Sequence, residues 1–123
     1  MKPEIFEDRA VLNFSDEKVE ALDDRSVPGL IFGYGKDQKI VRLEFLNPRK
    51  RARTDQVLIV ERYDPQADAL GVTLDQGCWH DTEETPEGYL IDFDSEHRIV
   101  ALEFLGASEL FPQAALARLS QAA

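Results

Sequence analysis

The chain has 123 residues, of which 43% are hydrophobic and 31% are charged, a size and composition typical of one globular domain. Its formal charge is −10: residues 1–60 carry 11 basic and 11 acidic side chains, whereas residues 61–123 carry 3 basic and 13 acidic ones. The acidic second half disfavours nucleic acid and anionic membranes as partners and favours a basic protein, with solubility alone as the alternative explanation.

The first half of the chain predicts four short strands. Residues 10–14 and 18–22 are the first two candidates. Residues 30–32, Leu-Ile-Phe, are β-forming and are followed by a polar, turn-like break at 35–38. The phrase IVRLEFL at 40–46 then returns as the second arm of a hairpin.

A basic segment separates the two halves, and the second half repeats this layout. Residues 49–55 contain four basic side chains and are predicted to be a linker; a phosphate-binding loop is the less favoured alternative. Four further strands are predicted, over 57–62, 69–74, 78–83 and 89–91. The phrase IVALEFL at 99–105 closes a second hairpin, and Pro112 followed by alanines and leucines predicts a short C-terminal helix.

The two seven-residue phrases belong to a longer internal repeat. Residues 29–46 align with residues 88–105 without a gap, and seven of the 18 positions are identical. Upstream the match fades, and Leu12 and Phe14 align best with Val72 and Leu74 at an offset one residue longer, which implies a length change in a turn. Because a sheet of about 50 residues buries too little apolar area to be secure alone, we expect the two copies to cover each other's apolar faces with pseudo-twofold symmetry.

The fold class predicted from these features is mainly β. Two tandem β-meander repeats are expected to pack as a sandwich-like single domain with a short C-terminal helix. Residues 1–48 would form the first repeat, residues 49–55 the linker, and residues 56–123 the second repeat with the helix.

The second half also carries a recognisable order of residues. In chain order these are Tyr63, Asp64, Asp68, Ala69, Leu70, Glu84, Gly88, Ile91, Asp92, Phe93, Asp94, Val100, Leu102 and Glu103. Over roughly residues 57–110 the pattern resembles the prokaryotic domain-of-unknown-function family 2283. The first half is similar to a degenerate copy, with Gly33 and Gly35 where Asp92 and Asp94 would be. The resemblance implies a β-meander with a terminal helix, no catalytic residues, and an antitoxin-like role, since some members are thought to sit beside small toxin-like proteins.

Two groups of residues have side chains of the kinds that bind metals. Asp92, Asp94 and Glu96 could collect Ca²⁺ or Mg²⁺, but without a flanking glycine they are better explained as a solvated hairpin end. Cys78 and His80 would share one face of a strand, yet a closed zinc site needs about four ligands, and a Cys–His nucleophile needs an oxyanion loop that is not visible. We therefore predict no metal and no cofactor.

The repeated glutamates have two interpretations. Strand alternation places Val41 and Leu43 on the core face and leaves Glu44 on a mixed face, with Glu103 as its counterpart. The two carboxylates could meet near a pseudo-twofold axis and perform acid–base work. The favoured alternative is that both lie on the outer face, Glu44 beside Arg42.

These observations predict an uncharacterised, non-enzymatic protein-interaction module, antitoxin-like in its narrower form, that binds a basic partner through its acidic second half. Trp79 is a candidate surface aromatic, with core or edge packing as the alternative. The candidate binding residues are Trp79, Asp81, Glu83, Glu84, Asp92 and Asp94. No residue is assigned a catalytic role.

Two other predictions concern activity and assembly. The alternative function is a small metal-dependent hydrolase that uses Asp92, Asp94 and Glu103, with His97. Free sheet edges would allow a homodimer. The single cysteine, Cys78, and an N-terminus without an apolar leader predict a cytoplasmic protein.

Overall fold

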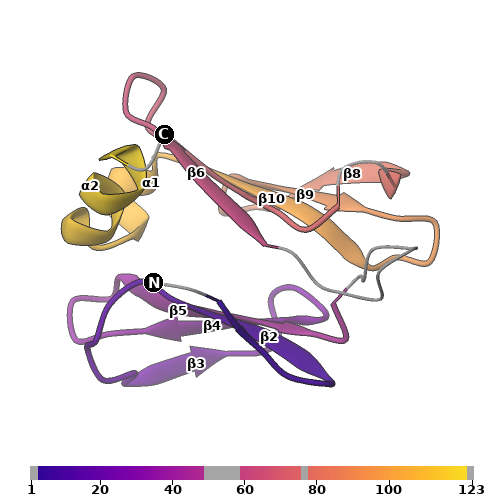
Figure 1. Ribbon diagram of the computed structural model, residues 1–123, viewed down its shortest axis with the longest axis horizontal. Helices are drawn as coiled ribbons and strands as arrows, with labels where there is room; N and C mark the ends of the chain where they lie inside the picture. Colours follow the sequence, from indigo (N-terminus) through magenta and orange to yellow (C-terminus); the bar gives the residue numbers. More distant parts are fainter. Residues whose placement is uncertain (1–2, 49–58, 76–77, 122–123) are drawn as a thin grey trace.

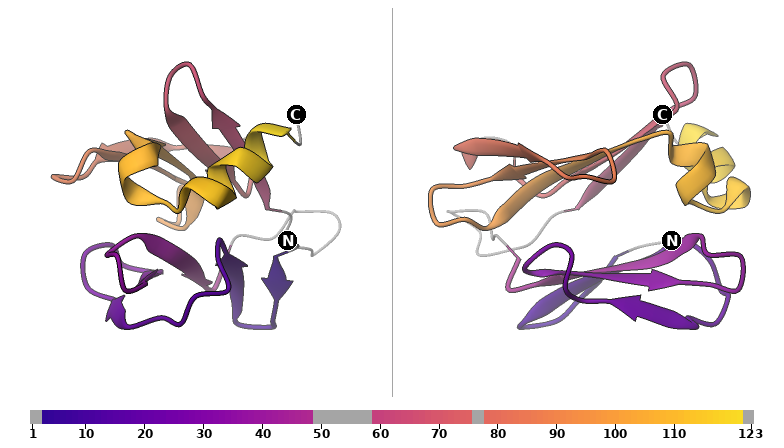
Figure 2. Two further views of the ribbon diagram at one scale, coloured as in Figure 1. Left: turned by 90° about the vertical axis from the view of Figure 1, so that its left-hand side faces the viewer. Right: turned by 180° about the vertical axis from the view of Figure 1, so that it is seen from behind.

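The computed structural model describes residues 3–48, 59–75 and 78–121, and within them two antiparallel sheets are stacked face to face (Figure 1). Each sheet has five described strands, and two helices lie at one end of the stack (Figure 2). The prediction of a mainly β fold with a short C-terminal helix is therefore confirmed. The predicted linker at 49–55 lies outside the described residues.

The first sheet has the strand order β1-β2-β5-β4-β3. Its strands are β1 (Glu4–Ile5), β2 (Arg9–Asn13), β3 (Ala21–Asp23), β4 (Leu30–Tyr34) and β5 (Ile40–Leu46). The second sheet has the order β6-β7-β10-β9-β8. Its strands are β6 (Val60–Asp64), β7 (Ala69–Thr73), β8 (Asp81–Glu84), β9 (Tyr89–Phe93) and β10 (Ile99–Leu105). In both sheets the repeated seven-residue phrase is the central strand, β5 or β10.

The strand pairings of the two sheets correspond residue by residue. Leu30 pairs with Phe45 in the first sheet, and Tyr89 pairs with Phe104 in the second, 59 residues later. β2 and β3 correspond to β7 and β8 at an offset of 60. Between equivalent ladder positions, the chain from β3 to β4 thus has one residue more than the chain from β8 to β9. Three backbone positions with positive φ recur as well: Gly29 and Gly88, Gln38 and His97, Asn47 and Gly106.

One hydrophobic core lies between the sheets. Phe32 of β4 reaches across to the second sheet, with its ring centroid 5.8 Å from Tyr89 and 6.5 Å from Phe104. Phe111, which follows the first helix, lies 4.9 Å from Phe14 and 5.0 Å from Phe104. The apolar faces of the two halves therefore cover each other, as expected for sheets too small to be stable alone.

Two helices close one end of the sandwich, where the yellow segment meets both layers in Figure 1. They are α1 (Ala107–Leu110) and α2 (Gln113–Gln121). Contacts with the first sheet hold them in place: Arg118 donates to the Phe14 carbonyl at 3.3 Å, and Lys39 donates to the Glu109 carbonyl at 2.8 Å. In the described part of the chain, neither helix has the length and hydrophobicity to cross a membrane.

Several predicted strand boundaries need correction. β3 begins at Ala21 rather than at residue 18, and β8 begins at Asp81 rather than at residue 78. Both are edge strands with one neighbour each, so fewer ladder bonds extend them. The sequence indicates neither β1 nor α1, because elements of two and four residues are too short to show periodicity.

The predicted face of Val41 is wrong. A register shift opposite Gly33 and Tyr34 inserts a β-bulge into the hairpin, so that Tyr34 pairs with Ile40 rather than with Val41. Ile40, Leu43 and Phe45 therefore belong to the inter-sheet core, whereas Val41 is buried outside it. The second sheet has the equivalent bulge between Ile99 and Ala101. Simple alternation fails here because a bulge changes which face each following residue occupies.

Candidate functional site

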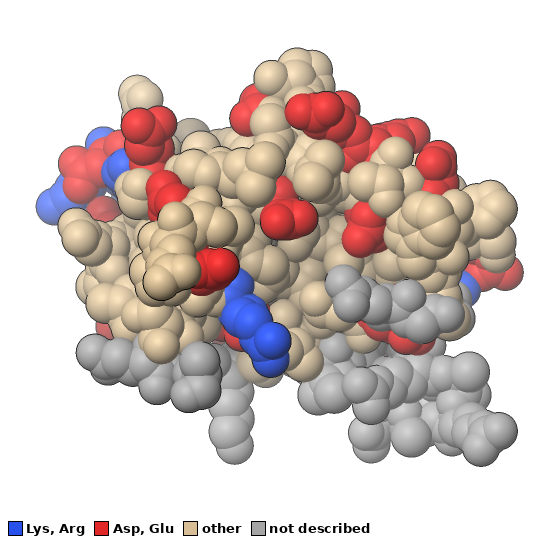
Figure 3. Space-filling view, turned by 90° about the horizontal axis from the view of Figure 1, so that it is seen from above, with Lys and Arg blue, Asp and Glu red and all other residues tan. Residues whose placement is uncertain are grey.

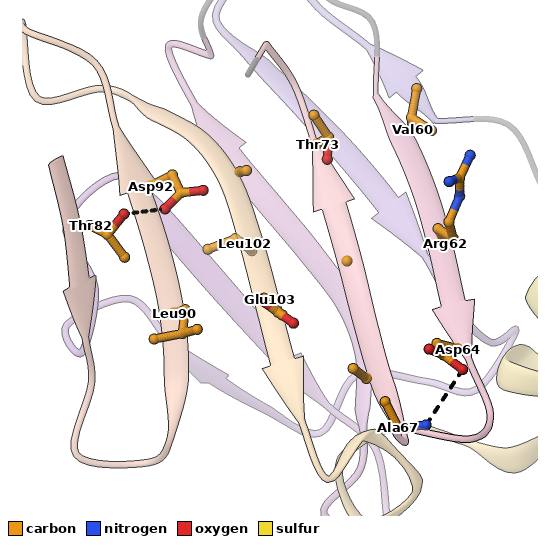
Figure 4. A pocket seen from close by; sticks show the side chains of 13 residues that line it. Val60, Arg62, Asp64, Ala67, Thr73, Thr82, Leu90, Asp92, Leu102 and Glu103 are labelled. Atoms are coloured by element: carbon orange, nitrogen blue, oxygen red, sulfur yellow. Dashed lines mark hydrogen bonds between the residues drawn. The ribbon is translucent and has the colours of Figure 1, made fainter. Parts of the chain in front are cut away.

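A hollow of about 580 Å³ opens on the outer face of the second sheet, the face turned away from the core (Figure 4). We call it the second-sheet hollow. All five strands of the second sheet, with the turn after β6, contribute to it. The residues that line it are Val60, Arg62, Asp64, Ala67, Ala69, Gly71, Thr73, Thr82, Leu90, Asp92, Ala101, Leu102 and Glu103.

Small side chains on the two central strands form the floor of the hollow. Ala69, Gly71 and Thr73 alternate outward along β7, and Ala101 lies beside them on β10. A Cβ added to Gly71 would meet nothing closer than the Arg62 carbonyl oxygen at 3.9 Å. The depth of the hollow therefore results from small side chains on β7 and β10, which remain paired to each other from Ala69 to Thr73 and from Ala101 to Leu105.

The hollow is predominantly acidic. Asp64, Asp92 and Glu103 line it together with one arginine, Arg62. Figure 4 shows Glu103 in the middle of the sheet, whereas Arg62 points along β6 toward Val60 and away from Glu103. Seen from the same side, the face carries many more acidic than basic side chains (Figure 3). Within the described residues, the Glu103 carboxylate has no hydrogen-bond or ion-pair partner.

Strand β8 forms an acidic edge beside the hollow. All four of its residues are exposed, and three of them are carboxylates: Asp81, Glu83 and Glu84. Trp79 precedes the strand with 57% of its surface exposed, which excludes packing in the core and agrees with a place at the sheet edge. The structure thus brings five of the six predicted binding residues to β8 and its neighbour β9.

A chain of hydrogen bonds links Trp79 to the hollow. The indole Nε1 of Trp79 donates to Thr82 Oγ1 at 2.7 Å, and that hydroxyl donates to Asp92 Oδ1 at 2.6 Å. These bonds fix the orientation of the indole and of the Asp92 carboxylate on one exposed surface. Fixed, exposed aromatic and acidic groups are suited to recognise a partner, because little side-chain freedom is lost on binding.

The sixth predicted residue, Asp94, is not part of this surface. Its side chain is 2% exposed and accepts hydrogen bonds within its own turn, from the backbone N–H groups of Glu96 and Arg98 and from the Arg98 side chain. Sequence alternation groups Asp94 with Asp92, but β9 ends at Phe93, so the two carboxylates diverge. Asp94 therefore shapes the hairpin and is unavailable to a ligand.

Asp68, another residue of the family-like pattern, also has a structural role. Its carboxylate accepts hydrogen bonds from Tyr63 at 2.7 Å and from both the backbone and the hydroxyl of Ser108, at 2.9 and 2.7 Å. The hydrogen bonds from Ser108, and then that from Tyr63, lower the pKa of Asp68 below its ordinary value. This cluster ties the turn between β6 and β7 to the start of α1.

Glu44 and Glu103 do not meet, so the acid–base pair near an axis is wrong. Each lies on the outer face of its own sheet, because the residues on either side of it face the core. The favoured alternative is confirmed: Glu44 accepts from Arg9 at 2.7 Å and from Arg42 at 3.3 Å. The Glu44 side chain is 7% exposed, and its hydrogen bond raises the pKa of Arg9.

The groups proposed for a metal-dependent hydrolase are dispersed. His97 stacks on Phe93 with the ring centroids 4.1 Å apart, in the turn that Asp94 organises, while Asp92 and Glu103 face outward. Cys78 and His80 precede β8 rather than alternating within it. No cluster of three or more His, Cys, Asp or Glu suited to a metal ion occurs in the described ranges 3–48, 59–75 and 78–121.

The second-sheet hollow itself is absent from the sequence predictions. Glu103 enters them only as a partner of Glu44 or as a hydrolase carboxylate. Motif searches favour reactive side chains, whereas this feature depends on the small residues Ala69, Gly71 and Ala101. An alignment of the two halves provides a usable signal, because it shows the positions at which a long side chain in the first half corresponds to a short one in the second half.

Comparison with known proteins finds one family model that matches part of the second half of the chain. Residues 62–108 match the model of a family described as protein of unknown function (DUF2283), which confirms the resemblance seen in the second half. The matched segment runs from β6 into α1. The similarity of the first half to a degenerate copy stays a prediction. No curated protein matches the chain. No solved structure matches it.

Proposed function

We propose that this protein is a non-enzymatic interaction module that binds a basic protein through the acidic surface of its second sheet, formed by the edge strand β8 and the outer face beside it. The observation that carries the proposal is strand β8, a sheet edge whose four residues are all exposed and three of which are acidic. Trp79 stands beside it as a fixed, exposed aromatic. A carboxylate surface attracts basic partners over distance, and an exposed indole supplies apolar contact area after encounter.

The negative charge of β8 also bears on which partner can pair with this sheet edge. Three carboxylates on β8 would face each other if two copies paired through this strand, and such like-charge contact opposes pairing. This argues for a partner of different composition at β8. The antitoxin-like role is the narrower form of the proposal, in which the basic partner is a small toxin-like protein. A cytoplasmic location and an origin of the two sheets from one duplicated, pseudo-twofold-related unit belong to the same proposal.

Affinity capture from the native host, with matched charge variants, tests the proposal. The test variant carries Asp81→Asn, Glu83→Gln and Glu84→Gln. Its control carries Asp16→Asn, Glu20→Gln and Asp24→Asn, which remove the same charge from exposed positions in the first half.

We expect a basic protein that binds the wild type and the control but not the β8 variant, and that still binds directly once purified. Equal binding by both variants would show that net charge alone attracts the partner. Capture of no basic protein by the wild type, at low and moderate salt, would contradict the proposed function.

A further inference from the structure

Each sheet has a glutamate on the outer face of its central strand, Glu44 or Glu103. The residues that surround this glutamate differ between the two sheets. Equivalent ladder positions allow a direct comparison. In the first sheet, Glu44 pairs across the ladder with Val11, and in the second sheet Glu103 pairs with Gly71. Glu44 is 5% exposed, whereas Glu103 is exposed. The same carboxylate is therefore covered in one sheet and open in the other.

The residues that cover Glu44 are two arginines, and both are alanine in the second sheet. Arg9, which donates to Glu44 Oε1, corresponds to Ala69, since they pair with Leu46 and Leu105 respectively. Arg42, which donates to Oε2, corresponds to Ala101, which pairs with Thr73 as Arg42 pairs with Asn13. Both guanidinium groups on the glutamate have thus been removed, and their space belongs to the second-sheet hollow.

A further replacement adds negative charge at the same place. Arg42 pairs with Gly33 in the first sheet, whereas Ala101 pairs with Asp92 in the second. A group in the place of the Arg42 guanidinium would therefore meet the Asp92 carboxylate as well as Glu103. Diagonal neighbours on one face of a sheet lie about 7 Å apart. A single guanidinium group can bridge two acidic side chains across that distance, because these side chains are long or flexible.

From this comparison we infer that the second-sheet hollow binds an arginine side chain of the basic partner, with Glu103 and Asp92 as its carboxylate ligands. The inference rests on the proposed function and specifies its chemistry. Guanidinium is favoured over ammonium because its planar fork can serve two carboxylate oxygens at once, as the two arginines do around Glu44. The small floor residues leave room for the arginine stem, which packs against Gly71 and Ala101.

Two decapeptides that differ only in carrying four arginines or four lysines are the probes, and calorimetry at low salt gives both Kd values for each protein. Gly71→Val copies Val11 of the first sheet and fills the hollow without changing charge. Glu103→Gln removes the central carboxylate and serves if the first variant folds poorly. Glu87→Gln is the control, because it removes one charge from an exposed position in the turn between β8 and β9, outside the lining of the hollow and outside the acidic β8 edge.

We expect the arginine peptide to bind the wild type and Glu87→Gln roughly fivefold more tightly than the lysine peptide. In Gly71→Val and Glu103→Gln this ratio should fall to about one, while the lysine peptide still binds. An affinity ratio of one in the wild type, or a fivefold ratio that persists in both variants, would overturn the arginine site. Either result would leave the proposed binding of a basic partner to the acidic surface intact. If neither peptide binds, the site and the proposed function both fail. A dimer that Gly71→Val dissociates in sedimentation would overturn the inference in favour of a second copy of this chain.

Discussion

The two sheets have the same arrangement of strands, but their outer faces differ in whether the central glutamate is neutralised by arginines. In the first sheet, Arg9 and Arg42 neutralise Glu44 internally and bury it. In the second sheet the same ladder positions hold alanines, and Glu103 stays open to solvent. The difference shows that an open, acidic hollow can form on a paired sheet where small residues occupy the positions that arginines fill in the other sheet. The inner faces of both sheets, in contrast, carry large apolar residues, because the two sheets share one core.

The largest effect is expected from breaking the contact between the sheets. Phe104→Ala removes a ring that lies against Phe32, Tyr89 and Phe111, and should lower the free energy of unfolding by about 3–5 kcal/mol. Urea denaturation followed by circular dichroism measures this. Phe45→Ala, at the equivalent place in the first sheet, is the matched control and should cost less. A larger loss for Phe45→Ala would show that the inter-sheet aromatic cluster is not the centre of stability.

The next effect sharpens the comparison of the two glutamates. Arg9→Ala combined with Arg42→Ala leaves the buried Glu44 carboxylate without its partners, a change that costs on the order of 2 kcal/mol for such a group. Adding Glu44→Gln should recover part of the loss, since an amide is cheaper to bury than a charge.

Thermal unfolding at constant pH checks this series, and Glu103→Gln is its control. Because Glu103 is exposed and has no partner among the described residues, its replacement should change the unfolding free energy by less than about 0.5 kcal/mol. Equal effects of the Glu44 and Glu103 replacements would remove the distinction between a structural and an open carboxylate.

A smaller effect is expected at the paired hairpin turns. Asp94→Gly copies Gly35, and the backbone hydrogen bonds of the two turns are the same, including Asp94 N–H to the Arg98 carbonyl. The variant loses the bonds that the buried carboxylate accepts from Glu96 and Arg98, and glycine adds backbone freedom to the unfolded chain, so we expect a cost of about 1–2 kcal/mol, measured by urea denaturation. An unchanged midpoint would mean that the backbone alone holds both turns.

The smallest effect depends on pH. The pKa of Asp68 is held below its ordinary value of 3.8 by hydrogen bonds from Ser108 and Tyr63. A lowered pKa means that the folded state favours the carboxylate, so this stabilisation is fully present above pH 3.8 and is lost as the pH falls through the folded-state pKa.

Thermal melts from pH 7 to pH 2 test that sign. Asp68→Asn should lower the melting temperature at pH 7, and its difference from wild type should shrink in acid. Asp8→Asn is the matched control in the first sheet, where Asp8 makes only a long contact of 3.7 Å with Arg9. A difference that stays constant down to pH 2 would exclude the ionised Asp68 as its cause.

Much of the fold could be predicted because it follows from pattern. The repeated phrase, the polar breaks and the spacing of glycines locate the hairpins, since alternation and turn chemistry act locally. The misassigned face of Val41 shows the limit: whether a hairpin contains a bulge depends on how both strands pair, and the phrase IVRLEFL alone does not reveal this. The short elements β1 and α1 form only where β2 and Asp68 provide partners.

The candidate site was less predictable for a different reason. Asp92 and Asp94 look equivalent in sequence, yet Asp92 faces the hollow whereas Asp94 forms hydrogen bonds within a turn. The residues that open the hollow, Gly71 and Ala101, carry no reactive group. Their role can be recognised only once the sheet register places them beside Glu103. Acidic composition directs attention to the second half of the molecule, but it has no information about which acidic side chains are neutralised by arginines.

A map of backbone amide NMR shifts, recorded while the arginine decapeptide is added to the wild-type protein, tests the arginine site directly. We expect saturable shifts concentrated at Ala69, Gly71, Ala101 and Glu103, with no comparable change at Val11 or Glu44 on the opposite outer face. Shifts of similar size on both outer faces, or shifts that avoid the hollow, would contradict it.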